Sequence, residues 1–404
     1  MTMTDVPFTR VAQSLPASVP FVGPETMERA RGAPFKARIG ANESALGPSP
    51  RVRAAMIEAI EAGDPRLYCD PENHELRTAL ARRHGVALDE VVVDAGIDTL
   101  LGVTVRLFME QEDIAITSAG AYPTFAYQVS GFGGKLVTVP YRQQFEDPAA
   151  LLAAACERAT TAGGSSASLG IPNASRSNDG GSSHVRPGRV RLVYLANPDN
   201  PMGTRVSPAA VTTLVDGLPP GCLLLLDEAY VDYTDETADP VNPIIDTSDP
   251  RVIRFRTFSK AWGMAGMRIG YAIAHRDVIA GFERVRNHFG VNRLAQIAAL
   301  ASLEDDSYLE HVRESVRSGR QRIEVLADSH GLPWVPSATN FVAVDLGSAA
   351  RADSVMVHLL ERGVFVRKPA VAPLNVHVRI GIGSEEEHAL LETAFAAAFE
   401  SGVV

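Results

Sequence analysis

Short apolar runs alternate with longer amphipathic segments from about residue 90 to residue 274, and this alternation restricts the fold more than any other feature. The apolar runs cover residues 91–93, 114–116, 136–139, 192–195, 223–226, 252–255 and 269–274. Each has the length of a strand, whereas segments such as 99–108 and 124–131 have the length and spacing of helices. Strands that alternate with helices are joined by crossovers, which build a mainly parallel sheet with helices on both faces. We therefore predict an α/β fold.

The length of the chain and a change of pattern near residue 290 predict more than one domain. The 404 residues exceed a typical single domain, and 46% hydrophobic residues are enough for a sizeable core. We expect residues 1–60 to form an N-terminal arm and part of a small domain, and residues 61–290 to form a large domain. Residues 291–404 would complete the small α+β domain, with a long charged helix near 307–328 as the connector.

One segment of the expected large domain differs in composition from the rest. Residues 160–189 are rich in glycine, serine, alanine and asparagine and carry almost no large apolar side chains. Such a segment cannot bury enough surface to offset the entropy cost of ordering it. We expect a disordered surface insertion, with a substrate-access lid as the alternative.

Charge and cysteine content favour small-molecule chemistry inside the cell. The formal net charge is −10, and no basic cluster suits a nucleic acid or an anionic membrane. The three cysteines are an odd number without metal-ligand spacing, so we expect a reducing compartment and no metal site. The N-terminus lacks the pattern of a signal peptide, and no apolar run approaches the roughly 20 residues of a membrane span. We therefore expect a soluble cytoplasmic protein that binds neither nucleic acid nor membrane.

Lys260 is the strongest candidate for chemistry. It lies just after the apolar run 252–255, beside the hydroxyls of Thr257 and Ser259, and glycines and Arg268 follow it. An amine forms an imine with a carbonyl compound when its proton affinity is lowered, and a nearby cation such as Arg268 has that effect. Hydroxyl and guanidinium groups are also suitable donors to a phosphate. The simpler reading is a surface lysine after an edge strand.

The segment around Lys260 resembles the cofactor-lysine motif of fold-type I pyridoxal-phosphate enzymes, specifically the class I and II aminotransferases. In that motif a lysine is followed by glycines and, eight positions later, by an arginine, which are here Lys260, Gly263, Gly266 and Arg268. Two further family motifs come earlier in the expected order, at residues 197–204 (NPDNPMGT) and 227–230 (DEAY). The resemblance extends from about Ile39 to Gly383, and the histidinol-phosphate aminotransferases are the most similar group.

The resemblance implies a fold-type I architecture with a mainly parallel seven-stranded sheet and a smaller α+β domain. It also implies pyridoxal 5'-phosphate as the cofactor, held by Lys260 as an imine until an amino substrate displaces it. Asp227 would then pair with the protonated pyridine nitrogen, and Tyr230 and Asn200 would bind the phenolic oxygen. A helix-capping or turn role is the alternative for Asp227, and a plain turn is the alternative for the Asn200 segment.

The phosphate of the cofactor is expected at the start of a helix. Gly96, Ile97 and Asp98 end the first predicted strand and open the next helix, where backbone amides bind anions without a particular side chain. Ile97 stands where the family usually has serine, so only the backbone contact is expected there. A simple strand-to-helix turn is the alternative. The resemblance adds side-chain donors to the same phosphate, which are Thr257, Ser259 and Arg268.

Two aromatic residues complete the predicted cofactor site. Phe125 lies where the family stacks a ring, usually tyrosine, on the face of the cofactor, and core packing is the alternative for it. Tyr68 matches a tyrosine that reaches the cofactor phosphate of the neighbouring subunit. The resemblance therefore implies a homodimer with shared active sites.

Three residues are expected to bind the substrate. Arg379 corresponds to the arginine that clamps the substrate carboxylate, a planar bidentate task that suits a guanidinium group. An exposed arginine on a strand is the alternative. Arg367 corresponds to a residue that can bind the phosphate of histidinol phosphate, and Asn42 matches the start of a family Asn-Glu-Asn-Pro segment. The chain departs from that segment at Ser44 and Ala45.

The sequence thus predicts a pyridoxal-phosphate-dependent aminotransferase. An amino group would pass from an amino acid or histidinol phosphate to a 2-oxo acid such as 2-oxoglutarate. Aromatic or other amino acids are nearly as well supported as histidinol phosphate. A decarboxylase or a cyclising synthase on the same fold is an alternative, because a fold does not fix the reaction. An amine-sensing transcription-regulator module is a further alternative, although no DNA-reading domain precedes the fold.

Overall fold

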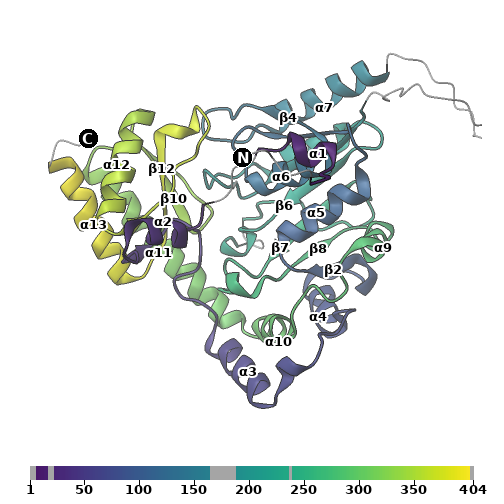
Figure 1. Ribbon diagram of the computed structural model, residues 1–404, viewed down its shortest axis with the longest axis horizontal. Helices are drawn as coiled ribbons and strands as arrows, with labels where there is room; N and C mark the ends of the chain where they lie inside the picture. Colours follow the sequence, from purple (N-terminus) through teal and green to yellow (C-terminus); the bar gives the residue numbers. More distant parts are fainter. Residues whose placement is uncertain (1–5, 17–21, 164–187, 236–238, 401–404) are drawn as a thin grey trace, which may run out of the picture.

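A computed structural model describes residues 6–16, 22–163, 188–235 and 239–400 of the chain. Figure 1 shows two parts side by side, a larger one built on a broad sheet and a smaller one that contains the C-terminal helices. The greater part of the predicted insertion at 160–189 lies outside the described residues. Its first residues, up to Gly163, are helical and form the end of α7.

The large part is built on a seven-stranded sheet with the order β2-β8-β7-β6-β5-β3-β4. All neighbouring strands from β7 to β4 are parallel, and β8 runs antiparallel to both β2 and β7. The mainly parallel sheet predicted from the alternating pattern is therefore confirmed. The strands are β2 (Val91–Asp94), β3 (Ile114–Ser118), β4 (Lys135–Val139), β5 (Val190–Ala196), β6 (Leu223–Asp227), β7 (Val252–Thr257) and β8 (Gly270–Ile273).

Helices cover both faces of this sheet, which explains why its central strands are apolar at successive positions. On β5, Leu192 and Tyr194 pack in the core that includes α5 and α9, whereas Val193 and Leu195 pack on the other face with α7 and α8. The covering helices are α4 (His74–His84), α5 (Ile97–Phe108), α6 (Pro123–Phe132), α7 (Pro148–Gly163), α8 (Pro208–Gly217) and α9 (Arg276–Val285).

Local signals set the ends of several of these helices. Ser207 accepts a hydrogen bond from the backbone N–H of Ala210 and Pro208 takes the first helical position, so α8 begins there. Pro123 likewise opens α6, which ends at Gly133 with a left-handed φ of 91°. These caps fix where the loops at the carboxyl ends of the strands turn into helices.

The small part joins the C-terminal residues to a piece of the N-terminus. Its antiparallel sheet has the order β12-β10-β9, and β1 near the N-terminus pairs in parallel with β11. The strands are β1 (Ala37–Arg38), β9 (Trp334–Val335), β10 (Phe341–Asp345), β11 (Val364–Phe365) and β12 (His377–Gly381). The helices of this part are α2 (Pro24–Arg31), α11 (Asp306–Ser329), α12 (Ala349–Glu361) and α13 (Glu385–Glu400).

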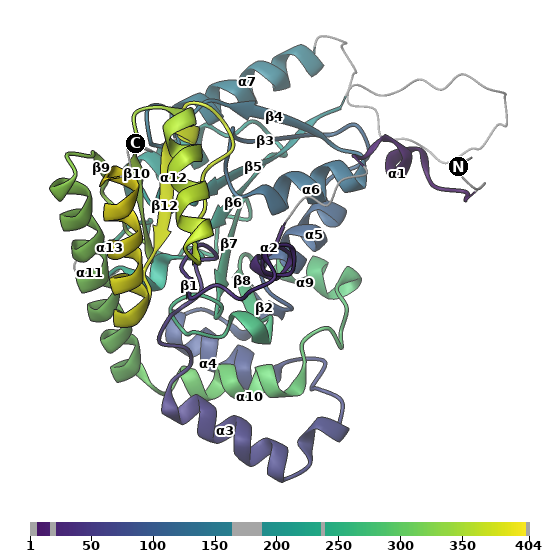
Figure 2. The ribbon, with the colours of Figure 1, turned by 60° about the vertical axis from the view of Figure 1, so that its left-hand side comes forward.

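Three more helices pack mainly on other helices. α3 (Pro50–Glu61) and α10 (Arg293–Ser302) pack against each other below the large sheet, as Figure 2 shows, and α10 also contacts α4. α1 (Arg10–Ser14) packs on α6. α10 follows residue 290 in the sequence but packs with α3 and α4, which precede the large sheet. The domain boundary expected at residue 290 therefore stays a prediction. No helix among the described residues is both long enough and apolar enough to span a membrane.

Candidate active site

A cavity of about 540 Å³ lies where the carboxyl ends of β5, β6 and β7 meet the small part of the molecule. Ligands bind at this edge of open α/β sheets because the loops that follow the strands converge there. The cavity brings together twelve of the predicted site residues, which are Asn42, Ile97, Asp98, Asn200, Asp227, Tyr230, Thr257, Ser259, Lys260, Arg268, Arg367 and Arg379. They come from both parts of the molecule and are far apart in the sequence.

Lys260 lies shortly after the end of β7, in the wall of this cavity. Its Nζ atom donates a hydrogen bond of 3.2 Å to the backbone oxygen of Asn42 and lies 5.6 Å from the centre of the Tyr230 ring. Gly263 in the same loop has a φ of 69°, and a Cβ there would come within 2.1 Å of the Gly47 oxygen. A glycine is therefore required for the loop to turn beneath the segment that contains Asn42.

The start of α5 and the Arg268 side chain form a cradle for an anion. Gly96 caps the helix with a φ of 86°, and a Cβ at this position would meet Nη2 of Arg268 at 2.7 Å. The backbone amides at the helix start have no partner within the helix, so they are available to an anion. Arg268 reaches Ser259 Oγ at 3.5 Å and Asp98 Oδ2 at 3.3 Å, which holds its guanidinium group beside the helix. The residues present therefore fit a phosphate group.

Asp227 ends β6 and is buried. Its Oδ2 accepts a hydrogen bond of 2.6 Å from the Tyr194 hydroxyl, and its Oδ1 accepts one of 2.9 Å from the backbone N–H of Ala229. Burial raises the pKa of Asp227 to about 6, against the lowering by these two donors. A protonated ring nitrogen would supply the positive charge that favours the ionised carboxylate, so this residue fits the predicted cofactor as well.

Tyr230 and the two predicted amide side chains occupy the middle of the cavity wall. Nδ2 of Asn42 donates to the Tyr230 hydroxyl at 2.8 Å, and Oδ1 of Asn42 is buried without a hydrogen-bond partner among the described residues. Oδ1 of Asn200 instead accepts a hydrogen bond of 2.5 Å from Arg379. Asn200 therefore links the large part of the molecule to the arginine of β12.

Two of the arginines that line the cavity lie side by side. Arg367 and Arg379 form an isolated β-bridge through backbone hydrogen bonds of 3.3 and 2.7 Å. Arg379 donates to Asn200 and to the Gly40 oxygen, while its Nε is buried and has no partner among the described residues. Burial lowers the pKa of both guanidinium groups. An anionic substrate group would relieve this cost, because it would pair with charges already removed from water.

The structure places Phe125 away from the cavity, against the predicted contact with the cofactor. Its side chain is fully buried and stacks on Tyr194, with ring centres 4.9 Å apart and an angle of 13° between the planes. Tyr194 lines the cavity in its place. The core-packing alternative is thus the one that the structure supports, because a second ring stands between Phe125 and the cavity.

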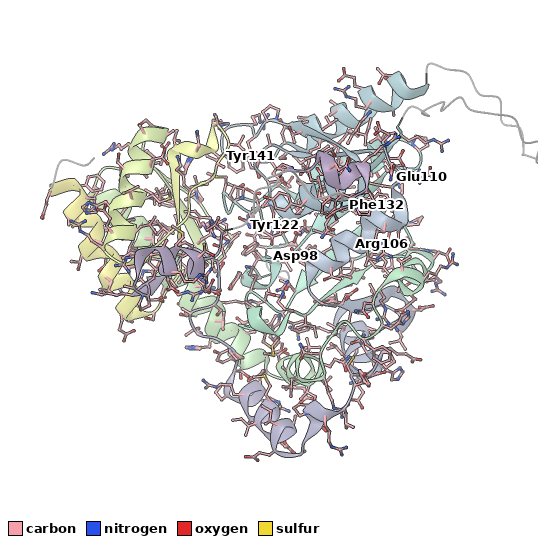
Figure 3. All side chains as sticks on the ribbon, viewed as in Figure 1. Asp98, Arg106, Glu110, Tyr122, Phe132 and Tyr141 are labelled. Carbon is pink, nitrogen blue, oxygen red and sulfur yellow. The ribbon has the colours of Figure 1, made fainter. Side chains whose placement is uncertain are left out.

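Tyr122 and Tyr194 line the cavity although neither was predicted to. Tyr122 precedes α6, and its hydroxyl donates to Oδ1 of Asp98 at 3.2 Å. Figure 3 shows Asp98 and Tyr122 close together on the side of the large part that borders the small part. Both tyrosines lie at or just after the carboxyl end of a strand. Their position near a strand end was the one feature of the sequence that could have indicated a place in the cavity. Aromatic residues of the core occur at the same kind of position, so this feature alone did not identify the two tyrosines.

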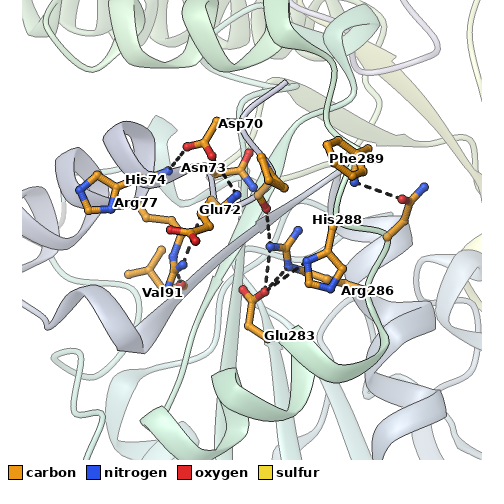
Figure 4. A network of polar contacts seen from close by, with 12 residues as sticks. Asp70, Glu72, Asn73, His74, Arg77, Val91, Glu283, Arg286, His288 and Phe289 are labelled. Atoms are coloured by element: carbon orange, nitrogen blue, oxygen red, sulfur yellow. Dashed lines mark hydrogen bonds and ion pairs between the residues drawn. The ribbon is translucent and has the colours of Figure 1, made fainter. Parts of the chain in front are cut away.

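Tyr68 lies outside the cavity, on the surface. Its side chain is 85% exposed and contacts the ring of Phe289, with centres 5.5 Å apart. The loops that carry these two rings are held by a polar network, which Figure 4 shows. In it, Arg286 donates to the Pro71 oxygen at 2.6 Å and to Glu283 at 2.8 Å, and Asp70 accepts from the backbone N–H of His74. The two exposed rings thus lie on loops that the Arg286–Pro71 hydrogen bond joins.

Within the described residues, no group of histidine, cysteine and acidic side chains could hold a metal ion.

Comparisons with known proteins agree with the geometry. A sequence model of the family "Aminotransferase class I and II" matches residues 36–395. A histidinol-phosphate aminotransferase from Moorella thermoacetica is 30% identical over 367 residues, which cover 90% of this chain and 86% of that protein. One from Anaeromyxobacter sp. is 32% identical over 379 residues, with 93% and 95% covered.

A solved structure gives the same result in three dimensions. The histidinol-phosphate aminotransferase from Sinorhizobium meliloti in complex with pyridoxal-5'-phosphate is 42% identical, with a TM-score of 0.87 over 99% of this chain and 100% of that one. An aspartate aminotransferase from Thermus thermophilus, at 21% identity and a TM-score of 0.74, shares the fold. The chain therefore belongs to the class I and II aminotransferases, the pyridoxal-phosphate-dependent family that its lysine motif resembles.

Proposed function

We propose that this aminotransferase takes the amino group of histidinol phosphate and passes it to a 2-oxo acid such as 2-oxoglutarate. The observation that carries the proposal is the pair Arg367 and Arg379, which lines the same cavity as Lys260 and offers two cations to one anionic group. Histidinol phosphate has a phosphate as its anionic group, and guanidinium pairs bind phosphate and carboxylate alike. The names of the most similar proteins agree with this choice.

The proposed chemistry divides among residues that the structure brings together. Pyridoxal phosphate supplies an electron sink for the pair of electrons left at the substrate Cα. Lys260, once its amine is free, is the general base that removes the Cα proton. Asp227 would pair with the ring nitrogen and favour its protonated form, and Tyr230 would donate to the phenolic oxygen. The backbone start of α5, with Arg268, Ser259 and Thr257, would hold the cofactor phosphate.

Substrate orientation would come from the other side of the cavity. Arg379 is already fixed by its hydrogen bonds to Asn200 and to the Gly40 oxygen, so little order is lost when an anion binds. Its Nε, which has no hydrogen-bond partner within the part of the chain that the structure describes, is an additional donor. Asn42 contacts both Tyr230 and, through its backbone oxygen, Lys260, so it would align these two side chains.

We also propose that the active unit is a homodimer in which Tyr68 serves the neighbouring site. Tyr68 does not line its own cavity, and it is 85% exposed, with its ring beside that of Phe289. Exposed large apolar side chains on α3, which are Ile57 and Ile60, add to the surface that a second copy could cover.

A cytoplasmic location stays a prediction that cell fractionation would test.

The test of the substrate is a panel of amino donors against 2-oxoglutarate. The panel contains histidinol phosphate, histidinol, phenylalanine, tyrosine and aspartate, and the products are assayed for keto compounds and for carbon dioxide. We expect histidinol phosphate to give the highest kcat/KM and no carbon dioxide. A higher kcat/KM with an aromatic amino acid would reject the proposed donor. Stoichiometric carbon dioxide would reject transamination as the reaction.

A further inference from the structure

Tyr194 is a fully buried tyrosine whose hydroxyl and ring are each engaged. Its hydroxyl lies 2.6 Å from Oδ2 of Asp227, and its ring stacks face to face on Phe125. Tyr194 and Asp227 are on adjacent strands, β5 and β6, near the edge that opens into the cavity, and both line it. The direction of the hydroxyl is therefore fixed by the sheet on one side and by the Phe125 ring on the other.

We propose that Tyr194 is a positioning residue that sets the basicity of Asp227. By donating to the carboxylate, it would keep the proton shared between Asp227 and the cofactor ring nitrogen on the nitrogen. The inference rests on the proposed role of Asp227 and adds Tyr194 and Phe125 to it. Phe125 would act through Tyr194 by holding its ring in the plane that the hydrogen bond needs.

The surroundings of Asp227 explain why such a donor is needed. Asp98 on α5 and Glu228 beside it raise the pKa of Asp227, although Asp98 is paired with Arg268 and Glu228 with Arg254 and Arg256. The charge of Asp227 in turn raises the pKa of Glu146. Burial and these like charges favour the protonated form of Asp227. The Tyr194 hydroxyl and the Ala229 N–H favour the ionised form. Burial also raises the pKa of Tyr194 well above its ordinary value, so it remains a donor.

The direction of the effect follows from acid–base equilibrium. A carboxylate that loses a hydrogen-bond donor becomes more basic. A more basic Asp227 draws the shared proton from the ring nitrogen, and a neutral ring is the weaker electron sink. Removing a hydrogen bond to a charged group changes a pKa by about one to two pH units. In Tyr194→Phe, the pKa of Asp227 should therefore rise from about 6 to between about 7 and 8.

Two measurements test this, and neither depends on activity. The first titrates the Asp227 carboxyl band in the infrared spectrum of the cofactor-free protein, with Asp227→Asn used to identify the band. The second records the nitrogen-15 shift of labelled cofactor bound to each variant, which reports the protonation of the ring nitrogen. Tyr233→Phe is the matched control, because it removes a buried hydroxyl that has no hydrogen-bond partner among the described residues, Asp227 included.

We expect Tyr194→Phe to raise the pKa of Asp227 and to move the nitrogen shift toward that of a neutral ring, while Tyr233→Phe changes neither. Phe125→Leu, which keeps the hydroxyl but loosens the ring, should give a smaller change in the same direction. An unchanged pKa of Asp227 in Tyr194→Phe overturns the inference. So does an unchanged nitrogen shift in Tyr194→Phe when Asp227→Asn moves it. If Asp227→Asn itself leaves the shift unchanged, the proposed role of Asp227 fails, and the infrared titration still shows whether Tyr194 controls that carboxyl.

Discussion

Replacing Arg367 by alanine is the sharpest test of the proposed substrate. Its guanidinium group lies over the Phe365 ring at 5.2 Å and donates to the Val22 oxygen at 2.5 Å, so it is already positioned at the cavity wall. Lys368 lines the same wall, but its Nζ is paired with Asp353 at 2.5 Å. Removing Arg367 would delete a cation of the cavity wall at the position proposed for the phosphate, and removing Lys368 would delete a neighbouring cation that pairs with Asp353.

The expected magnitude follows from the contact that would be lost. A hydrogen bond to a charged group contributes roughly 1.5 to 3 kcal/mol, which corresponds to about a 10- to 150-fold change. Because the side chain is only partly buried, solvent screening favours the lower part of this range, about 10- to 30-fold. We expect Arg367→Ala to lower kcat/KM for histidinol phosphate by this factor, chiefly through KM.

The assay compares two donors that differ in the phosphate alone. Histidinol phosphate and histidinol are measured at steady state with the wild type, Arg367→Ala and Lys368→Ala, and thermal unfolding checks that each variant is folded. For histidinol, Arg367→Ala should change kcat/KM by less than about threefold, since histidinol has no phosphate with which Arg367 could form a charged hydrogen bond. Equal losses for the two donors would show that Arg367 does not bind the phosphate. If Lys368→Ala lowered kcat/KM for histidinol phosphate as much as Arg367→Ala does, the effect would come from the overall positive charge of the cavity wall and not from a specific contact of Arg367.

Three further predictions concern the cofactor and the dimer. Lys260→Ala should abolish both activity and the borohydride-trappable bond to the cofactor, and normal trapping would assign that bond to another lysine. The affinity of the wild type for the cofactor should fall as the pH drops below about 6, because burial raises the pKa of Asp227 to about 6 and the protonated carboxyl carries no charge. Asp227→Ala should bind the cofactor more weakly at all pH values, and a fluorescence titration should show no such pH-dependent step for it. Mixed Lys260→Ala and Tyr68→Ala subunits should regain up to half of the activity of a wild-type dimer per hybrid, since one site then has both residues intact. No gain after confirmed exchange would place Tyr68 outside the partner's site.

The sequence by itself determined the fold and the part of the site that lies at strand ends. The apolar runs predicted the strands of the large sheet because a strand that is covered by helices on both faces has apolar side chains at successive positions. Asp227 and Lys260 lie at or just beyond the carboxyl ends of β6 and β7, which are adjacent and parallel, so their proximity follows from the topology. Local backbone needs, such as those of Gly96 and Gly263, were likewise visible as a motif.

Only the tertiary structure decided which side chains face one another across the cavity. Phe125 and Tyr122 are three residues apart at the start of α6, and the sequence gives each a ring. Tyr122 meets the cavity and Phe125 does not, because α6 docks with Phe125 against Tyr194 of β5. The contacts of Arg379 with Asn200 and of Arg367 with Val22 join segments 179 and 345 residues apart. These contacts depend on how the small part packs against the large part. Neither the hydrophobic periodicity nor a local motif predicts contacts between residues so far apart in the sequence.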